Sequence, residues 1–216
     1  MILLVVSDTH NRYSEKDFRD IDDYCKNHNI EIKRIISLGD ITDFEYKLLK
    51  KDFNVPIYGV IGNHDWPTVL EINDIPNLHG NLLTFENGLS ATGFCGSSKY
   101  KATNEPNMFT QSRSVEIARQ LPVANILFSH DTACHDETLL SSNSSYSHAG
   151  LWGITRYLEH TPSCKLHIHG HLHQSFHNMI DGLTTICVFR WALIDVSDSL
   201  QVTYLYDFNL ANNINS

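Results

Sequence analysis

Side chains that can bind divalent metal ions are grouped in five short segments of this sequence. Together the segments supply carboxylate, amide and imidazole groups, a mixture that suits Mn, Fe, Zn or Co better than Ca. Two ligands separated by one residue on an extended chain point to the same side, so such pairs can reach one ion. The segments are Asp8-Thr9-His10, Gly39-Asp40, Gly62-Asn63-His64-Asp65, His130 and Gly170-His171-Leu172-His173.

A structural interpretation exists for each segment taken alone. Asp8, Asp40 and Asn63 could each cap a helix or close a turn. Asp43 is interpreted in that way, as a helix cap or a residue that supports a ligand. The metal interpretation is favoured because five separately placed segments agree.

Buried apolar strands precede these segments. Strand patterns cover residues 1–6, 32–38, 55–61, 123–128 and 165–169, and helical spacing is found over 15–28, near 44–49 and over 114–120 and 151–160. Alternation of strands and helices is typical of a parallel sheet with right-handed crossovers. Ligands in such sheets bind beyond the carboxyl ends of the strands. We therefore expect the polar segments to meet at that edge.

The middle and the tail of the chain are less regular. Residues 82–85 and 89–94 are predicted to form a hairpin, and residues 132–148 a long loop. The tail alternates short strands and is predicted to form a second sheet. Its strands cover residues 179–180, 184–189, 192–196 and 202–206. The length predicts a single domain over residues 1–216.

Composition limits the classes of function. Apolar residues make up 42% and charged residues 19% of the chain, which is typical of a globular protein. A formal charge of −9 argues against a nucleic-acid coat or binding to an anionic membrane, although a nuclease that neutralises phosphate with metal ions is compatible with it. The five scattered cysteines predict free thiols, and no targeting or membrane-spanning segment is visible, so we expect a cytoplasmic protein.

The five segments, in their order, resemble the motifs of the calcineurin-like metallophosphoesterase superfamily over residues 8–173. The resemblance implies an α/β fold in which two mixed β-sheets pack as a sandwich flanked by helices. It also implies two divalent ions as cofactors, Mn in the first place and Fe, Zn, Ni or Co as alternatives. One ion would be bound by Asp8, His10, Asp40 and His173, and the other by Asp40, Asn63, His130 and His171. The catalytic residues would be His64, facing the substrate, and Asp65, holding His64.

The remaining histidines receive different interpretations. His130 is flanked by Ser129 where the family often has glycine, so His135 and His148 are alternative ligands, but His130 ends a buried strand and they lie in the following loop. Packed positions inside a strand are predicted for His167 and His169, and surface positions for His28, His79, His160 and His177.

The resemblance implies a metal-dependent phosphoester hydrolase in which a metal-bound hydroxide attacks phosphorus and His64 protonates the leaving oxygen. The segment Ser147-His148-Ala149-Gly150 resembles members that hydrolyse phosphodiesters, which favours a small phosphodiester or a nucleotide as substrate. A phosphomonoesterase or a protein or nucleotide phosphatase is the alternative within the family. A non-catalytic protein-binding scaffold is disfavoured, because such members have usually lost ligands that are present here.

The loop from Thr132 to Ala149 follows directly after His130 and is rich in serine. Long loops on a rigid scaffold more often bind ligands than merely connect elements. We expect this loop to line or cover the substrate pocket, with Tyr146 and His148 as contacts. A plain surface connection is the alternative.

Overall fold

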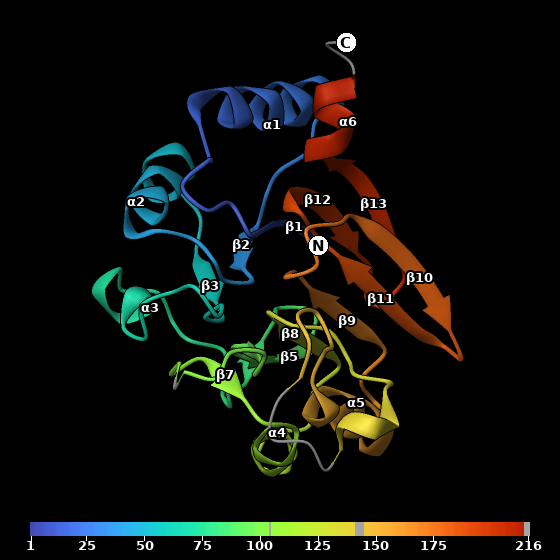
Figure 1. Ribbon diagram of the computed structural model, residues 1–216. Helices are drawn as coiled ribbons and strands as arrows, with labels where there is room; N and C mark the ends of the chain where they lie inside the picture. Colours follow the sequence, from blue (N-terminus) through green and yellow to red (C-terminus); the bar gives the residue numbers. More distant parts are fainter. Residues whose placement is uncertain (104, 141–144, 214–216) are drawn as a thin grey trace.

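Two large β-sheets lie face to face in the computed structural model, which describes residues 1–103, 105–140 and 145–213. Helices α1 and α6 lie beyond one sheet, and helices α4 and α5 lie beyond the other (Figure 1). Both sheets contain parallel and antiparallel pairs. The predicted α/β fold, a sandwich of two mixed sheets flanked by helices, is confirmed.

The first sheet has the strand order β13-β12-β1-β2-β3. Its parallel part consists of β1 (Ile2–Ser7), β2 (Arg34–Ser37) and β3 (Ile57–Gly59). The crossovers contain α1 (Glu15–His28) and α2 (Asp43–Asp52), and α3 (Val69–Ile72) follows β3. Both crossover helices begin with capping boxes, formed by Ser14 with Asp17 and by Thr42 with Glu45, which satisfy their first N–H groups.

The second sheet has the order β10-β11-β9-β8-β5-β4. The strands β5 (Ser90–Phe94), β8 (Ile126–Ser129), β9 (Leu166–His169) and β11 (Leu183–Cys187) run parallel, and β4 (Leu83–Thr84) and β10 (Phe176–Ile180) are antiparallel edges. The predicted hairpin of β4 and β5 is therefore confirmed. Between strands lie α4 (Gln111–Ala118), α5 (Trp152–His160), a 3-10 turn (Glu137–Leu139) and a small pair, β6 (Ser97–Ser98) with β7 (Met108–Phe109).

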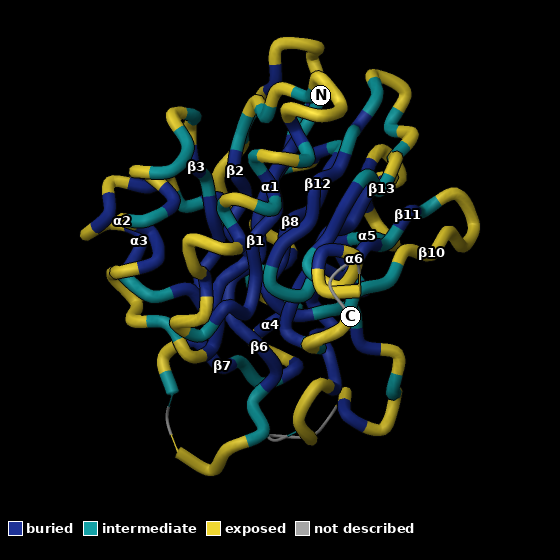
Figure 2. Tube along the Cα trace, turned by 90° about the horizontal axis from the view of Figure 1, so that it is seen from above, coloured by how far each residue is buried: buried dark blue, intermediate teal, exposed yellow. Residues whose placement is uncertain are grey.

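The strands form the buried centre of the molecule, and the connecting loops form its exposed surface (Figure 2). Leu4 and Ile36 of the first sheet and Phe128 and Ile168 of the second belong to one apolar cluster and are fully buried. Burying one such side chain is worth about 1.5–3 kcal/mol, so this shared core holds the two sheets together. The ends of strands from both sheets are thereby fixed near one another.

The prediction that the tail forms a second sheet of its own is wrong. Strand β11 pairs with β9 and brings β10 to the second sheet, whereas β12 (Arg190–Val196) pairs with β1 and brings β13 (Val202–Asp207) to the first. Without these partners, β1 and β9 would present rows of unpaired N–H and C=O groups. The tail thus completes both sheets, and it ends in a helix that was not predicted, α6 (Phe208–Asn213).

The surface interpretation of His79 is also wrong. Its Nδ1 accepts a hydrogen bond from the backbone N–H of Cys95 at 3.0 Å, and the residue is partly buried against Phe94. Burial lowers the pKa of this imidazole. The other three histidines assigned to the surface, His28, His160 and His177, are exposed, and His167 and His169 are buried as predicted.

We expect the His79→Gln variant to lose less stability in acid than the parent. Between pH 6.5 and the lowered pKa of the folded state, His79 gains a proton in the unfolded chain before it does so in the folded one, so its presence lowers the free energy of unfolding by up to about 1.4 kcal/mol per pH unit. Urea unfolding of metal-free protein at pH 7.5, 6.5 and 5.5 measures this difference.

Burial raises the pKa of Asp65 to about 7 and of Asp131 to about 6, so protonation of these two carboxyl groups stabilises the folded protein as the pH falls. Because this effect opposes that of His79, only a comparison between variants isolates the contribution of His79. The exposed His177→Gln serves as the control and should follow the parent. A His79→Gln profile parallel to that of the parent would contradict the prediction.

Candidate metal centre

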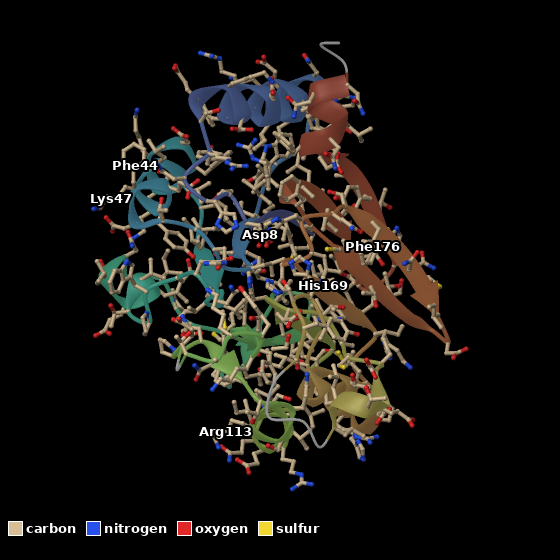
Figure 3. The ribbon with its side chains drawn as sticks, viewed as in Figure 1. Asp8, Phe44, Lys47, Arg113, His169 and Phe176 are labelled. Atoms are coloured by element: carbon tan, nitrogen blue, oxygen red, sulfur yellow. The ribbon has the colours of Figure 1, made fainter. Side chains whose placement is uncertain are left out.

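The five polar segments follow the carboxyl ends of five parallel strands. Asp8 follows β1, Asp40 comes after β2, Asn63 after β3, His130 after β8, and the segment with His171 and His173 after β9. Asp8 lies in the middle of the molecule, where the two sheets meet (Figure 3). Strands of both sheets therefore contribute to one site, as the strand pattern predicts.

One group of potential ligands consists of Asp8, His10 and His173, whose ligand atoms all lie within 4.8 Å of one another. The Nε2 atoms of the two histidines are 3.3 Å apart, and His173 Nε2 is 3.5 Å from Asp8 Oδ1. The carboxylate is buried, whereas His173 is exposed. The group therefore opens toward solvent.

A second group, Asp8, His130 and His171, is entirely buried and equally compact. Asn63 Oδ1 lies 2.9 Å from His130 Nε2. Asp40 Oδ2 lies between the two groups, 3.6 Å from His130 Nε2 and 3.8 Å from His10 Nε2. All seven predicted ligands are thus brought together, with Asp8 and Asp40 adjacent to both groups.

The donor set fits cations. His130 Nδ1 donates to the carbonyl oxygen of Leu38 at 2.8 Å, so a neutral ring would face Asn63 Oδ1 with a lone pair. Two acceptors 2.9 Å apart require a proton or a metal ion between them. In the described residues, Asp8 Oδ1 and His171 Nε2 are buried without a hydrogen-bond partner. Such atoms cost free energy unless a ligand satisfies them.

The titration of these groups agrees with this fit. Burial alone would raise the pKa of Asp8, but the close approach of the His173 imidazole, the charge of His130 and the hydrogen bonds from Ser7 and the His171 backbone lower it. Burial lowers the pKa of His171, so its ring is neutral and keeps a lone pair. Burial would also lower the pKa of His130, but the charges of neighbouring aspartates raise it, and a metal ion would replace that proton.

Several ligands have a left-handed backbone. The φ angles are 52° at Asp8, 46° at His10, 56° at Asp40, 65° at His171 and 53° at His173. This conformation costs roughly 1–2 kcal/mol per residue with a side chain, although Asp and His tolerate it better than most. Such strain gathers at functional sites, where the surrounding structure holds it in place.

Two glycines allow the carboxylates to come close to neighbouring backbone. A Cβ on Gly62 would lie 2.1 Å from Asp40 Oδ1, and one on Gly170 would lie 1.8 Å from Ser7 Oγ and 2.6 Å from Asp8 Oδ2. Any side chain at either position would push an aspartate away from the site. These contacts explain why Gly precedes both Asn63 and His171.

The structure places the Asp65 carboxylate against backbone N–H groups. Its carboxylate accepts hydrogen bonds from the backbone N–H groups of Gly62, Asp40 and Ile41 at 2.7, 2.8 and 3.0 Å. Within the described part of the chain, no hydrogen bond joins it to the His64 ring. Buried N–H groups of two tight loops need an acceptor, and Asp65 supplies one for both. These hydrogen bonds join the loops that carry Asp40 and Asn63.

His64 is exposed at the edge of the site. Its backbone N–H donates to Asp40 Oδ1 at 2.8 Å, and its ring lies edge-on to the His10 ring with 5.5 Å between centroids. The side chain is therefore close to the ligands and accessible from solvent. This position suits a group that faces a substrate.

Of the loop residues, His148 lies beside the site, whereas the Tyr146 hydroxyl is bonded within the loop. The His148 ring centroid is 4.8 Å from that of His171 and 6.2 Å from that of His173. The Tyr146 hydroxyl donates to Asp136 within the same loop. The alternative ligand His135 lines a separate cavity of about 500 Å³. Residues 141–144 of the predicted covering loop lie outside the described residues.

Sequence reasoning missed two supporting residues. Ser7 Oγ donates to Asp8 Oδ2 at 2.5 Å, and Asn63 Nδ2 donates to the Tyr100 hydroxyl oxygen at 3.3 Å. Ser7 directly precedes a ligand and could have been found as its neighbour. Tyr100 lies in a loop without periodicity, and nothing in its local sequence points to the site.

Solved structures resemble this fold at low sequence identity. An archaeal phosphodiesterase has a TM-score of 0.51 and 14% identity, and the match covers 94% of this chain and 98% of that one. A dimetal phosphatase from Danio rerio has a TM-score of 0.56 and 12% identity, with 95% and 93% covered. A candidate 5′-nucleotidase from Staphylococcus aureus has a TM-score of 0.52 and 12% identity, with 99% of this chain covered. This chain spans 58% of the length of that protein.

No curated protein matches the sequence. A family model described as "Calcineurin-like phosphoesterase superfamily domain" matches residues 1–188 of the 216. The match confirms the resemblance seen in the five segments and the prediction of a hydrolase that acts on phosphoester bonds. The chain belongs to the calcineurin-like phosphoesterase superfamily.

Proposed function

We propose that this protein hydrolyses a small phosphodiester or a nucleotide with the help of two divalent metal ions, Mn in the first place. The observation that carries the proposal is the position of Asp40, a buried carboxylate within 4 Å of an imidazole from each ligand group. Two cations placed close together repel each other, and a shared carboxylate reduces that repulsion. The arrangement supports a dinuclear rather than a mononuclear site.

As the family resemblance implies, one ion would be held by Asp8, His10, Asp40 and His173 and the other by Asp40, Asn63, His130 and His171. Asp8 also lies beside His130 and His171, so it is close to both positions. Ions bound there would supply positive charge for phosphate oxygens and would acidify a bound water. The mixture of imidazole, carboxylate and amide ligands suits Mn, with Fe, Zn, Ni or Co as alternatives.

The roles of the surrounding residues follow from their positions. His64 reaches the solvent side of the site and would donate a proton to the leaving oxygen. Asp65 would keep the loops of Asp40 and Asn63 in place through its three backbone hydrogen bonds. His148, beside His171, would donate a hydrogen bond to the phosphate or to its organic group. Tyr146 is the weaker proposed contact, since its hydroxyl is bonded to Asp136.

The preference for diesters rests on the resemblance of the segment around His148 to phosphodiesterases. The archaeal phosphodiesterase, the dimetal phosphatase and the candidate nucleotidase share the fold only, at 12–14% identity. A phosphomonoesterase or a protein or nucleotide phosphatase on the same ligands is therefore the second candidate.

The test combines metal analysis with a panel of substrates. After reconstitution with excess Mn²⁺ and gel filtration, we expect two ions per chain and hydrolysis of bis-p-nitrophenyl phosphate that chelation abolishes. The kcat/KM for this diester should exceed that for p-nitrophenyl phosphate. One ion or none per chain would overturn the dinuclear site, and a preference for the monoester would favour the second candidate. A protein that binds two ions but hydrolyses no ester would favour a scaffold.

We also propose a single domain over residues 1–216 and a cytoplasmic location. All five cysteines are free and buried, which supports a reducing compartment. Among the described residues, no helix is long and apolar enough to span a bilayer. The charge of −9 supports a small substrate rather than nucleic acid, since the protein would repel a polyanion away from its metal ions.

A further inference from the structure

A cavity of about 500 Å³ lies on the outer face of the second sheet, beside α5. We propose that it binds a small aromatic cation that carries a ring N–H group. Cavities of this size bind drug-sized ligands in other proteins. None of the proposed metal ligands lines the cavity, so it is a second site, separate from the metal centre.

The walls of the cavity are largely apolar. Alternate side chains of a strand share one face, and Phe176 and Ile180 of β10 face the cavity together with Leu183 of β11. The helix α5 contributes Leu158, and the loop after β8 contributes Ala133. A ligand would be surrounded by these groups, so its body has to be apolar as well.

One polar side chain in the cavity requires a hydrogen-bond donor. His167 of β9 lines the cavity and is only 1% exposed. The Ser129 hydroxyl lies 2.7 Å from His167 Nε2 and donates its hydrogen to the carbonyl oxygen of Asp131 at 2.6 Å. Because a hydroxyl has a single hydrogen, Ser129 accepts from His167, and the ring proton is therefore on Nε2. Nδ1 of the neutral ring then presents a lone pair.

Within the described part of the chain, this lone pair has no partner. Nδ1 is also not among the unpartnered polar atoms that are wholly buried, so it borders the open space of the cavity. Burial lowers the pKa of His167 well below its usual value, so the ring stays neutral and no proton occupies the lone pair. A ligand N–H would satisfy an acceptor that is otherwise costly to bury.

The exposed rim of the cavity favours a cation. It carries two carboxylates, Glu159 at the end of α5 and Asp181 in the turn between β10 and β11, and no lysine or arginine among the described residues that line the cavity. Asp181 has no ion-pair partner in the described ranges, and Glu159 forms only an exposed pair with Arg156. With the net charge of −9, these carboxylates repel anions such as nucleotides.

Tryptamine is the probe, because it combines an indole N–H at the ring edge with an ammonium group on a short chain. Metal-free protein is titrated at pH 8.0, which limits protonation of His135 in the same cavity, and the titration is followed by backbone and imidazole nitrogen NMR. We expect a Kd of roughly 0.1–1 mM, with shift changes centred on the lining residues. The His167 Nδ1 signal should move upfield as this atom accepts a hydrogen bond. Lack of saturation below about 5 mM, or changes centred on the metal ligands, would overturn the proposal.

Two analogues of tryptamine separate the two interactions. In the benzothiophene analogue, sulfur replaces the ring N–H, so binding should weaken by about 3–10-fold, the loss expected for one hydrogen bond. Indolepropionate keeps the N–H but carries a carboxylate, and it should bind at least about fivefold more weakly than tryptamine. Equal affinity of either analogue would overturn the proposal, since His167 would not be the acceptor or the rim would not select a cation.

The Asp181→Asn variant tests the rim from the side of the protein. Asparagine keeps the size of the side chain and tolerates the left-handed φ of 51° at this turn, so the variant should fold normally. Its affinity for tryptamine should fall by about 2–5-fold, as expected for one exposed charge pair. The matched control is Asp74→Asn, an exposed aspartate with a φ of 48° after α3. Equal affinities of the two variants would contradict a role of Asp181.

A second copy of the chain is the other occupant that the experiment tests. We expect the molar mass measured by light scattering to be the same with and without tryptamine. A dimer that tryptamine dissociates would assign this face to a contact between copies and overturn the proposal. Because tryptamine binding requires no metal ion, a protein that binds fewer than two ions would overturn the proposed function alone.

Discussion

The Asp40→Asn variant is expected to lose bound metal and at least about a hundredfold in kcat/KM. Asp40 Oδ2 lies within 4 Å of His10 and of His130, so one oxygen serves both ligand groups. Asparagine keeps the size of the side chain and tolerates the left-handed φ of 56° at this position. It removes the negative charge that two cations would share, and a ligand itself should matter more than its partners, which contribute 10–100-fold.

Metal content after gel filtration, measured beside kcat/KM, checks this expectation. Asp43→Asn is the matched control, since Asp43 begins α2 on the surface, where it pairs with Lys47 at 2.6 Å. Surface pairs of this kind contribute about 0–1 kcal/mol, so the control should keep its metal and its activity. An Asp40→Asn protein that retains two ions per chain would show that Asp40 is not shared.

The His64→Ala variant should keep both ions and lose about 10²–10⁴-fold in kcat on substrates with poor leaving groups. The ring is exposed and lies beside His10, outside both compact ligand groups. Protonation of the leaving oxygen matters most when that oxygen is basic, as in an alkyl ester. With a p-nitrophenyl ester the loss should be much smaller.

Paired assays on alkyl and p-nitrophenyl diesters, together with metal analysis, measure this difference. His177→Ala on the exposed strand β10 is the control for removal of a histidine. Loss of metal in His64→Ala would place this side chain among the ligands. Equal losses on both substrate types would exclude a role as general acid.

The sequence predicts much of the site because its chemistry is local. Strand patterns end at Asp8, Asp40 and Asn63, and parallel strands bring their carboxyl ends together whatever the details of packing. Short segments that directly follow a strand therefore carry their own positional information. The spacing of His171 and His173 is less informative, because their left-handed backbone sends the two side chains to different ligand groups, whereas an extended chain would direct both to one ion.

Other features depend on partners far away in the chain. Alternating patterns in β11 and β12 indicate strands but do not tell which sheet edge each strand will join. In the sequence, Asp65 looks like a partner of its neighbour His64. In the structure, its carboxylate accepts hydrogen bonds from N–H groups of the Asp40 loop, which is distant in the sequence. His79 meets Cys95 only after β5 has folded beside it. No single segment of the sequence predicts pairings of this kind.

The left-handed backbone at the ligands has an evolutionary consequence. Five ligand positions have φ angles between 46° and 65°. In this region the backbone conformation costs less free energy for glycine and asparagine than for aspartate or histidine. A duplicated copy released from selection for hydrolysis could therefore gain up to about 1 kcal/mol at such a position while discarding a ligand. Decay of the metal centre would then proceed without unfolding the protein, and the sandwich would survive as a ready scaffold for other tasks. Selection for folding alone would therefore not retain these ligands.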